Sequence, residues 1–491
     1  MFRPTLEEAE DIAGTRQYQV IPISTEMYAD VVTPIELLKI LKNNSGHCFM
    51  LESAEDSKGW GRYTFLGFEP TMEVTCVNGV MTITSGTTER YATMEPNRYI
   101  QNVLDDHKSP RFDYLPPFAG GLVGYFSYDY VKYSEPALDL DADDNEGFND
   151  VDLMLFDKVI AYDHHRQKII IIVNVKADDI GEEYKRGIRE LERLKNLITY
   201  GIPVREERVK LRTKFKALFT KDEFCRMVEK AKEHIRNGDI FQVVLSNRME
   251  ADFEGSLLDT YRALRTTNPS PYMFYMGGHD IEIAGASPET LVKLQDKKVF
   301  TFPLAGTRPR GRTKKEDDEL EQGLLSDQKE LAEHNMLVDL GRNDLGKICR
   351  PGSVNVDRYL SVLRFSHVMH LGSTVSGDVL DDKTGIDAIN AVLPAGTLSG
   401  APKIRAMQII NSLENNKRGI YGGAIGYLDF AGNADTCIAI RIAYKKNGKV
   451  FVRAGAGIVA DSIPEMEHKE CENKMKAILC ALERSNGGVN K

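Results

Sequence analysis

Two acidic stretches of the chain carry side chains whose types and spacing could bind a metal ion. Glu330 and Glu333 stand three residues apart, and so do Glu467 and Glu470, with Lys474 one further turn along. Residues three or four apart lie on one face of a helix, so each pair would turn two carboxylates to one side. Four carboxylates and a lysine could meet at one site, although glutamates at this spacing are also common on solvated helix faces.

Both stretches contain the residues that usually begin a helix. Asp327 can cap the first one, with Glu330 three residues on as in a capping box, and Pro464 fits the first position of the second. Thr33 and Thr220 precede two further predicted helices in the same way. Local capping therefore predicts where the candidate ligands begin their helices.

Runs of strand-forming residues dominate the N-terminal part and return in the second half. Asn78-Gly79 between two such runs predicts a hairpin. In the second half we expect single strands over 281–294, 359–379 (which includes His367 and His370) and 435–444. Residues 310–321 mix basic and acidic side chains, a pattern typical of a mobile exposed loop.

Length and composition bound the class of protein. At 491 residues the chain exceeds one typical core, and a charged stretch suggests a boundary between an N-terminal sheet-rich region, 1–205, and a second region, 215–488. The net charge of -10 argues against a nucleic-acid surface. Neither a membrane-spanning run nor a signal peptide is visible, and seven scattered cysteines fit the reducing cytoplasm.

Residues 455–460, Gly-Ala-Gly-Ile-Val-Ala, match a loose dinucleotide-binding fingerprint. That interpretation requires a further parallel strand with an acidic residue after the helix, and the residues up to Lys491 do not supply one. The glycines suit another purpose better, because a backbone without side chains lets N–H groups approach an anionic ligand.

Several motifs in order resemble those of the chorismate-utilising enzymes, most closely the family of anthranilate synthase large subunits. They are PLAGTRPRG, KELAEHNMLVDLGRND, FSHVMHL, AGTLSGAPKIRAM, GGAIGY, IAIR, AGAGIVADS and the final ExxExxxK. The resemblance implies an α/β (α+β) fold in which two large, mostly antiparallel sheets form a sandwich with helices outside. It also implies chorismate, which carries two carboxylates, as the substrate.

The same resemblance implies a Mg2+ ion held by Glu333 and Glu470, with Glu330 and Glu467 on metal-bound waters. Hard oxygen ligands of this kind are what Mg2+ prefers. The residues implied in substrate binding are Gly306, Thr307, Thr397, Tyr421, Arg441, Gly455, Ala456, Gly457 and Lys474.

The implied reaction has two steps. Ammonia adds at C2 of chorismate as the C4 hydroxyl leaves, and the intermediate then loses pyruvate to give anthranilate. Glu289 matches the general acid that protonates the leaving hydroxyl, and His370 matches a histidine associated with the elimination. Gln242 stands where water-adding relatives have a lysine base, and Ala305 stands where some C4-aminating relatives have a nucleophilic lysine.

The resemblance further implies a partner and an inhibitor. No glutaminase motif is visible, so ammonia would come from a glutamine amidotransferase subunit, anthranilate synthase component II. Tryptophan would bind a distinct effector site and inhibit the enzyme. The residues implied in that site are Leu51, Glu52, Ser53, Asn268, Pro271, Tyr272 and Met273. The chain departs from the family at Met50, usually leucine, and at Cys471, usually threonine.

Two other functions fit parts of this pattern. One is another chorismate enzyme, chiefly the aminodeoxychorismate synthase component I of the 4-aminobenzoate route, which aminates C4. The other is a tryptophan-binding regulatory protein without catalysis, against which Glu333, Glu470 and Arg441 count heavily. Turnover of chorismate, the identity of the product and inhibition by tryptophan distinguish the three.

Overall fold

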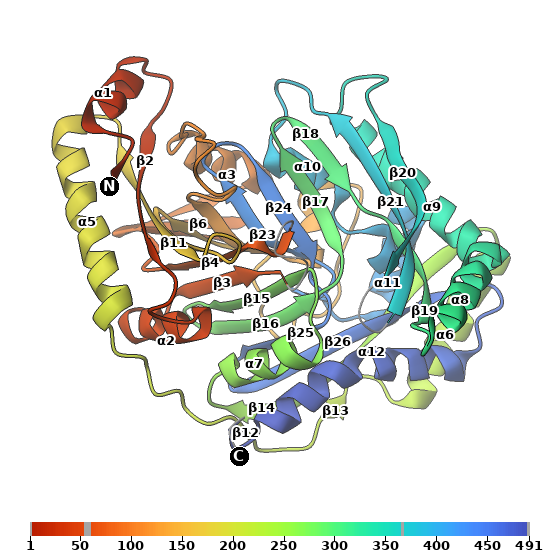
Figure 1. The fold of residues 1–491 in the computed structure, drawn as a ribbon. Helices are drawn as coiled ribbons and strands as arrows, with labels where there is room; N and C mark the ends of the chain where they lie inside the picture. The colour runs from red at the N-terminus through yellow and green to blue at the C-terminus, as the bar shows by residue number, and fades with distance from the viewer. Residues whose placement is uncertain (1, 54–59, 365–367, 489–491) are drawn as a thin grey trace.

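The computed structural model describes residues 2–53, 60–364 and 368–488 and contains two large β-sheets that face each other, with helices on their outer sides (Figure 1). Neighbouring strands pair antiparallel in both sheets. The predicted α+β sandwich is therefore confirmed. His367, one of the two histidines noted in the sequence, lies outside the described residues.

The first sheet has fourteen strands. In spatial order they are β1 (Phe2–Arg3), β2 (Val20–Tyr28), β11 (Lys168–Lys176), β10 (Lys158–Asp163), β4 (Tyr63–Phe68), β3 (Cys48–Glu52), β15 (Tyr272–Gly277), β16 (Ile281–Ser287), β25 (Ile442–Lys446), β26 (Lys449–Ile458), β14 (Gln242–Glu254) and β12 (Lys210–Leu211), with β13 (Lys216–Ala217) and β22 (Gly400–Ala401) also paired to β14.

The second sheet has twelve strands. In spatial order they are β19 (Leu304–Pro309), β21 (Val368–Asp378), β18 (Lys298–Thr301), β17 (Thr290–Gln295), β24 (Ala434–Ile438), β23 (Ala424–Asp429), β8 (Gly121–Phe126), β9 (Val151–Phe156), β5 (Met72–Val77), β6 (Val80–Ser85) and β7 (Thr87–Ala92), with β20 (Asn355–Arg364) paired to β21.

Apolar side chains from both sheets fill the space between them. Phe49 of β3 and Ile172 of β11 share one buried cluster with Tyr125 of β8, Phe156 of β9 and Ile425 of β23. Because successive side chains of a strand point to opposite faces, the other face of each sheet is left for helices to cover.

Helices cover both outer faces. The first sheet packs against α1 (Leu6–Gly14), α2 (Pro34–Asn44), α5 (Ile180–Tyr200), α6 (Lys221–Arg236), α7 (Leu258–Thr267), α11 (Lys403–Glu414) and α12 (Pro464–Ser485), and the second against α3 (Pro96–Asp105), α4 (Val131–Ser134), α8 (Lys314–Ser326), α9 (Gln328–Gly346) and α10 (Gly385–Val392). None of the described helices has the length and apolar character needed to cross a membrane.

The predicted helix starts are present. Asp327 caps α9 by accepting the N–H groups of Lys329 and Glu330, and Pro464 is the first residue of α12. Thr220 and Glu223 form the predicted capping box of α6. Local sequence was sufficient here because a cap and its partner lie within one turn.

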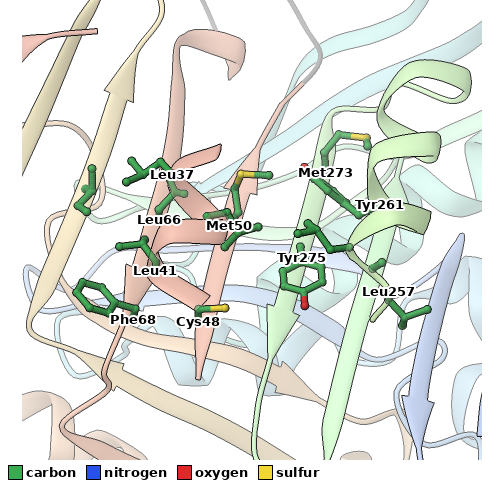
Figure 2. Close-up of a cluster of buried hydrophobic side chains, with 14 of the residues drawn as sticks. Leu37, Leu41, Cys48, Met50, Leu66, Phe68, Leu257, Tyr261, Met273 and Tyr275 are labelled. Carbon is green, nitrogen blue, oxygen red and sulfur yellow. The ribbon is translucent and has the colours of Figure 1, made fainter. Parts of the chain in front are cut away.

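The two predicted regions share one sheet and one core. β3 pairs with β15 in the register Met50↔Tyr275, and Met50, Tyr261 and Tyr275 lie in the same buried cluster (Figure 2). Both sheets take strands from each region. The division into 1–205 and 215–488 stays a prediction.

Two segments with similar sequences, GGLVGYF at 120–126 and GGAIGYL at 422–428, contribute adjacent strands. β8 pairs antiparallel with β23, and Gly124 lies opposite Gly426. A Cβ atom on Gly124 would come within 2.0 Å of the Asp152 carbonyl oxygen, and one on Gly426 within 2.0 Å of that of Asp435. Only glycine therefore fits where these strands approach their outer neighbours.

Two sequence predictions are wrong here. Residues 310–321 do not form an exposed loop, because α8 begins after the cap Thr313 and Asp317 pairs with Arg310 at 2.8 Å. Residues 359–379 are not one strand but parts of β20 and β21, which pair antiparallel. The sequence showed the charged residues of 310–321 and the apolar residues of 359–379. It did not show the helix cap at Thr313 or the pairing of β20 with β21.

Candidate functional site

Two segments of the chain pass from one sheet to the other side by side. β16 of the first sheet leads through Pro288 and Glu289 into β17 of the second, and β24 of the second leads through Ile440 and Arg441 into β25 of the first. The prediction of single strands over these segments, 281–294 and 435–444 in the sequence, is therefore wrong. Each predicted strand is two strands in different sheets.

Hydrogen bonds hold the two crossings together. The Ile438 N–H donates to the Glu289 carbonyl at 2.9 Å, and the Ala286 N–H donates to the Arg441 carbonyl at 3.1 Å. Arg441 has a φ of +52°, a left-handed conformation that is uncommon for a side chain of this size. The crossings thus place one acidic and one basic side chain next to each other between the sheets.

Both side chains line a cavity of about 600 Å³, within the usual size range of small-molecule sites. Its walls come from β14, β19, β21, β26, α9, α12 and the short turn Gly396–Leu398. The sequence-predicted residues that line it are Gln242, Glu289, Gly306, Thr307, Glu330, Glu333, His370, Thr397, Tyr421, Arg441, Gly455, Gly457, Glu467, Glu470 and Lys474. The structure thus brings together residues that are more than 200 positions apart in the sequence.

Ala456 is the one predicted substrate-binding residue whose side chain lies elsewhere. It alternates with Gly455 and Gly457 on β26, so its methyl group points to the other face and packs in the cluster of Phe224 and Val228 on α6.

Glu289 is half-buried in the cavity wall and accepts a hydrogen bond from the Thr397 hydroxyl at 3.1 Å. Burial raises the pKa of Glu289 to about 7, against the opposing effects of this hydrogen bond and of Arg441 and Lys474. Its carboxyl can therefore carry a proton near neutral pH, which is the state that a general acid requires.

The glutamate pairs differ in their partners. Glu330 forms an ion pair with Arg308 at 3.2 Å, and Glu470 forms one with Lys474 at 2.7 Å. Burial, and secondarily Glu330, raises the pKa of Glu333. Burial also raises the pKa of Glu467. Burial and like charges both disfavour the ionised form of these carboxylates, so a nearby cation would stabilise that form.

The donor set fits a hard divalent cation. Glu333 is half-buried, and its side chain has no hydrogen bond or ion pair with any residue that the structure describes. No three His, Cys, Asp or Glu side chains of the described residues form a complete metal site. An ion at Glu333 and Glu470 would therefore need water or ligand oxygens as well, as Mg2+ sites usually do.

His370 on β21 contacts the cavity from the side of β19. Its Nδ1 lies 2.9 Å from the Gly306 carbonyl oxygen and 3.1 Å from the Thr307 hydroxyl. Burial lowers the pKa of His370. Because a carbonyl oxygen only accepts, the neutral ring has its proton on Nδ1 and keeps Nε2 as the basic nitrogen.

The glycines of β26 leave room for the side chains that face them in the cavity wall. A Cβ atom on Gly457 would lie 2.6 Å from Nε2 of Gln242, and one on Gly455 would lie 3.0 Å from the Tyr421 hydroxyl. Lys474 donates to the Gly455 carbonyl at 3.0 Å. The glycines that resembled a dinucleotide fingerprint thus lie on β26, where the strand packs closely against other residues of the cavity wall.

Sequence reasoning missed two cationic residues that line the cavity, Lys329 and Arg453. Arg453, Gly455 and Gly457 alternate along β26, so the period of two could have placed Arg453 on the same face. Lys329 follows the cap of α9, one residue before Glu330, and carries no comparable signal.

A second cavity, of about 220 Å³, lies between the two sheets. The predicted effector residues that line it are Leu51, Glu52, Ser53, Pro271, Tyr272 and Met273. Asn268 ends α7 and does not reach its wall. The sequence did not indicate further residues that line it, among them Tyr63 and Phe65 of β4, Lys293 of β17, Tyr427 of β23, and Asp435 and Cys437 of β24.

Polar contacts tie this cavity to its surroundings. The Tyr272 hydroxyl lies 2.8 Å from Asp435 and 3.0 Å from the hydroxyl of Thr290, the neighbour of Glu289. Arg265 donates two hydrogen bonds to Glu52, from Nε at 2.7 Å and from Nη2 at 3.0 Å. The strands β17 and β24, which line the smaller cavity, thus continue into the crossings that line the larger one.

Cys471, the departure from the family beside Glu470, points away from the cavity. It is buried in the apolar cluster between α6 and α12, and burial raises the pKa of its thiol to about 12. The thiol is therefore protonated at neutral pH and acts as a small apolar side chain.

The position of Glu289 predicts an observable titration. Thr397→Val removes a hydrogen bond that lowers the pKa of Glu289, so its pKa should rise above the value of about 7 in the unaltered chain. The measurement is the infrared C=O band of the protonated carboxyl as a function of pH. Subtracting the spectrum of Glu289→Gln isolates this band from those of Asp152 and Asp429, whose pKa values burial also raises to about 7. A Glu289 band already lost at pH 5 would contradict this description.

Comparisons with known proteins agree with this geometry. The family described as chorismate binding enzyme matches residues 46–480. The chain is 45% identical to "Anthranilate synthase component 1" of Acetivibrio thermocellus, covering 99% of each chain, and 44% identical to the protein of that name in Aquifex aeolicus, covering 98% of this chain and 97% of the other.

Solved structures show the same fold. Anthranilate synthase component I from Streptococcus pneumoniae superposes with a TM-score of 0.75 at 38% identity, covering 92% of this chain and 98% of that one. The menaquinone-specific isochorismate synthase from Escherichia coli has a TM-score of 0.69 at 18% identity over 97% of this chain and 99% of its own. With the fold, the cavity and these relatives in agreement, the chain belongs to the chorismate binding enzymes.

Proposed function

We propose that the protein converts chorismate and ammonia to anthranilate and pyruvate in a Mg2+-dependent reaction, the first step of tryptophan biosynthesis. The observation that carries the proposal is the cavity wall in which Glu289, able to hold a proton near pH 7, lies with Arg441 at the crossings between the sheets. Relatives that carry the name anthranilate synthase component 1 over nearly their whole length support it.

Mg2+ would be held by Glu333 and Glu470, with Glu330 and Glu467 on its waters, and would neutralise a carboxylate of chorismate. Arg441 and Lys474, together with the N–H groups of the β26 glycines, would bind and orient the remaining anionic oxygens. These roles are proposals that rest on which side chains line the cavity.

In the first step Glu289 would donate its proton to the C4 hydroxyl, which leaves as water while ammonia forms a bond to C2 and the ring double bonds shift. Gln242 cannot act as a base, and ammonia needs none because its lone pair is already available. In the second step Nε2 of His370 is the basic nitrogen suited to the proton transfer that accompanies loss of pyruvate.

The same proposal includes a partner subunit that supplies ammonia and an inhibitor that binds the smaller cavity. A glutamine amidotransferase subunit would deliver ammonia to the cavity, because the chain has no glutaminase motif of its own. Tryptophan would occupy the smaller cavity between the sheets, whose aromatic walls suit an indole ring. The free state of all seven cysteines agrees with the reducing cytoplasm that the sequence predicts.

The test is a product assay with purified protein, chorismate, Mg2+ and an ammonium salt at alkaline pH, with fluorescence and mass detection. Anthranilate emission supports the proposal. Chorismate consumed without anthranilate would favour the C4-aminating synthase, and no consumption would favour a regulatory protein.

Removal of a proposed metal ligand should abolish turnover. Glu470→Ala leaves one carboxylate to hold Mg2+, and we expect a loss of at least about a hundredfold in turnover. Glu472→Ala is the matched control, since Glu472 lies on the same helix, is exposed and pairs only with Lys469 among the described residues. Wild-type turnover of Glu470→Ala at saturating Mg2+ would remove Glu470 from the metal site.

Crowding the smaller cavity should separate catalysis from inhibition. Ser53→Phe places a ring in the cavity wall, so tryptophan should inhibit at least about tenfold more weakly while turnover without tryptophan is kept. Ser85→Phe, at the exposed end of β6, is the control. Unchanged inhibition of Ser53→Phe would place the effector site elsewhere.

A further inference from the structure

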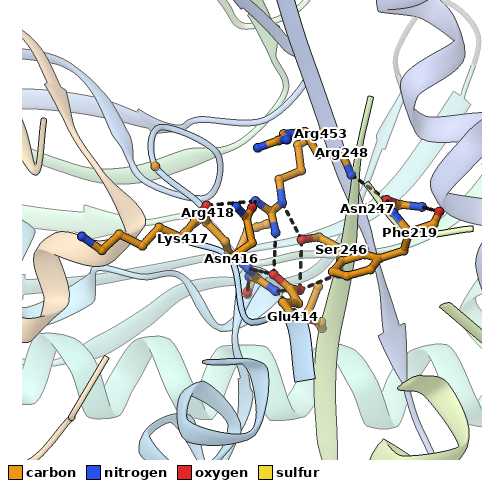
Figure 3. A network of polar contacts seen from close by, with 12 residues as sticks. Phe219, Ser246, Asn247, Arg248, Glu414, Asn416, Lys417, Arg418 and Arg453 are labelled. Atoms are coloured by element: carbon orange, nitrogen blue, oxygen red, sulfur yellow. Dashed lines mark hydrogen bonds and ion pairs between the residues drawn. The ribbon is translucent and has the colours of Figure 1, made fainter. Parts of the chain in front are cut away.

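A cluster of buried charged side chains forms part of the wall of the larger cavity. Glu414, the last residue of α11, pairs with both Arg418 and Arg453, and all three side chains are 1% exposed. Figure 3 shows the two guanidiniums converging on this one carboxylate. Arg453 itself lines the cavity.

The protein satisfies most of the hydrogen-bonding capacity of these guanidiniums. Arg453 donates to Glu414 at 2.7 Å, to the Ser246 hydroxyl at 2.8 Å and to the Asn416 side-chain oxygen at 2.9 Å. Arg418 donates to Glu414 at 2.6 Å and to the Leu398 carbonyl at 2.6 Å. The guanidinium of Arg453 therefore lines the cavity while most of its N–H groups already donate to other residues of the protein.

The cluster carries more positive than negative charge. Two guanidiniums share one carboxylate, which leaves an excess of one positive charge. Two other carboxyls are near, but Glu146 pairs with Arg248, and Asp129 accepts the Gly419 N–H at 2.8 Å. Neither forms an ion pair with Arg418 or Arg453 in the described residues.

A buried excess charge is costly unless an opposite charge lies close, because the interior does not screen it as water does. Five glutamates already line the cavity, so an anionic ligand would be repelled without nearby cations. Lys329, Arg441 and Lys474 line the cavity directly. The buried cluster adds a further positive charge that no glutamate of the cavity pairs with in the described residues.

We propose that the excess positive charge of Glu414, Arg418 and Arg453 selects a doubly charged anion for the cavity. The identification of that anion as chorismate rests on the proposed function. Arg453 is then a positioning residue, which acts through the electrostatic potential of the wall, and its effect grows with the number of negative charges on the ligand.

Three variants separate charge from shape. Arg453→Gln removes the positive charge, and Arg453→Lys keeps it. Asn416→Asp keeps the acceptor that Arg453 bonds to and cancels the excess charge with almost no change in shape. It also replaces the 3.4 Å hydrogen bond from Asn416 to Glu146 with a contact between two carboxylates. Thermal unfolding checks that each variant is folded, and Asn416→Asp decides the question if Arg453→Gln does not fold.

The measurement is the dissociation constant, by calorimetry with Mg2+ and without ammonia, of chorismate with two carboxylates and of anthranilate with one. Arg453→Gln and Asn416→Asp should each weaken chorismate about tenfold and anthranilate about threefold, because a Coulomb energy scales with ligand charge. Arg453→Lys should stay within about twofold of the unaltered chain for both ligands.

Equal weakening of both ligands, or unchanged binding in Asn416→Asp, would overturn the proposal. Binding without turnover keeps this test apart from the proposed function. An unaltered chain that binds chorismate and makes no anthranilate contradicts the function while the charge comparison still stands. One that binds no chorismate overturns both.

Discussion

The site depends on two neighbouring crossings of the chain between the sheets. A strand that leaves one sheet for another loses its ladder partners, and buried backbone groups must find new ones. Here the crossings supply them to each other, through Ile438 to Glu289 and Ala286 to Arg441. The same arrangement that satisfies the backbone holds the carboxyl of Glu289 and the guanidinium of Arg441 next to each other between the sheets.

Charge governs the cavity around these crossings. Helices α9 and α12 bring four glutamates to it, while β26 brings glycines and an arginine. Burial moves Glu289 toward its protonated form and His370 toward its neutral form, so the cavity contains both a proton donor and a basic nitrogen near neutral pH. The cluster of Arg418, Arg453 and Glu414 adds a fixed charge from behind the wall.

The two cavities are built on common strands. β17 and β24 contribute Lys293 and Asp435 to the smaller one and lead directly into Glu289 and Arg441 at the larger one. The Tyr272 hydroxyl contacts Thr290, the next residue after Glu289. A ligand that shifts these strands at one cavity would therefore act on the other through covalent and hydrogen-bonded neighbours.

What the sequence could predict follows from how local each interaction is. The cap of α9 and the proline that begins α12 were predicted because these signals lie within one turn of the helix start, and the sandwich and most cavity residues came from family motifs. The prediction of one strand over each of 281–294 and 435–444 was wrong, because the change from one sheet to the other depends on pairing with distant strands. Arg453 was missed because its partners, Glu414 and Asn416, approach it only in the folded chain.

The most direct test of this account is where a metal ion binds. Crystals grown with Mn2+ in place of Mg2+, and with chorismate, would show the ion by its anomalous scattering. The account predicts a single strong peak within bonding distance of both Glu333 and Glu470, at the cavity that contains Glu289. A peak that avoids either glutamate, or a chorismate molecule bound away from that cavity, would contradict it.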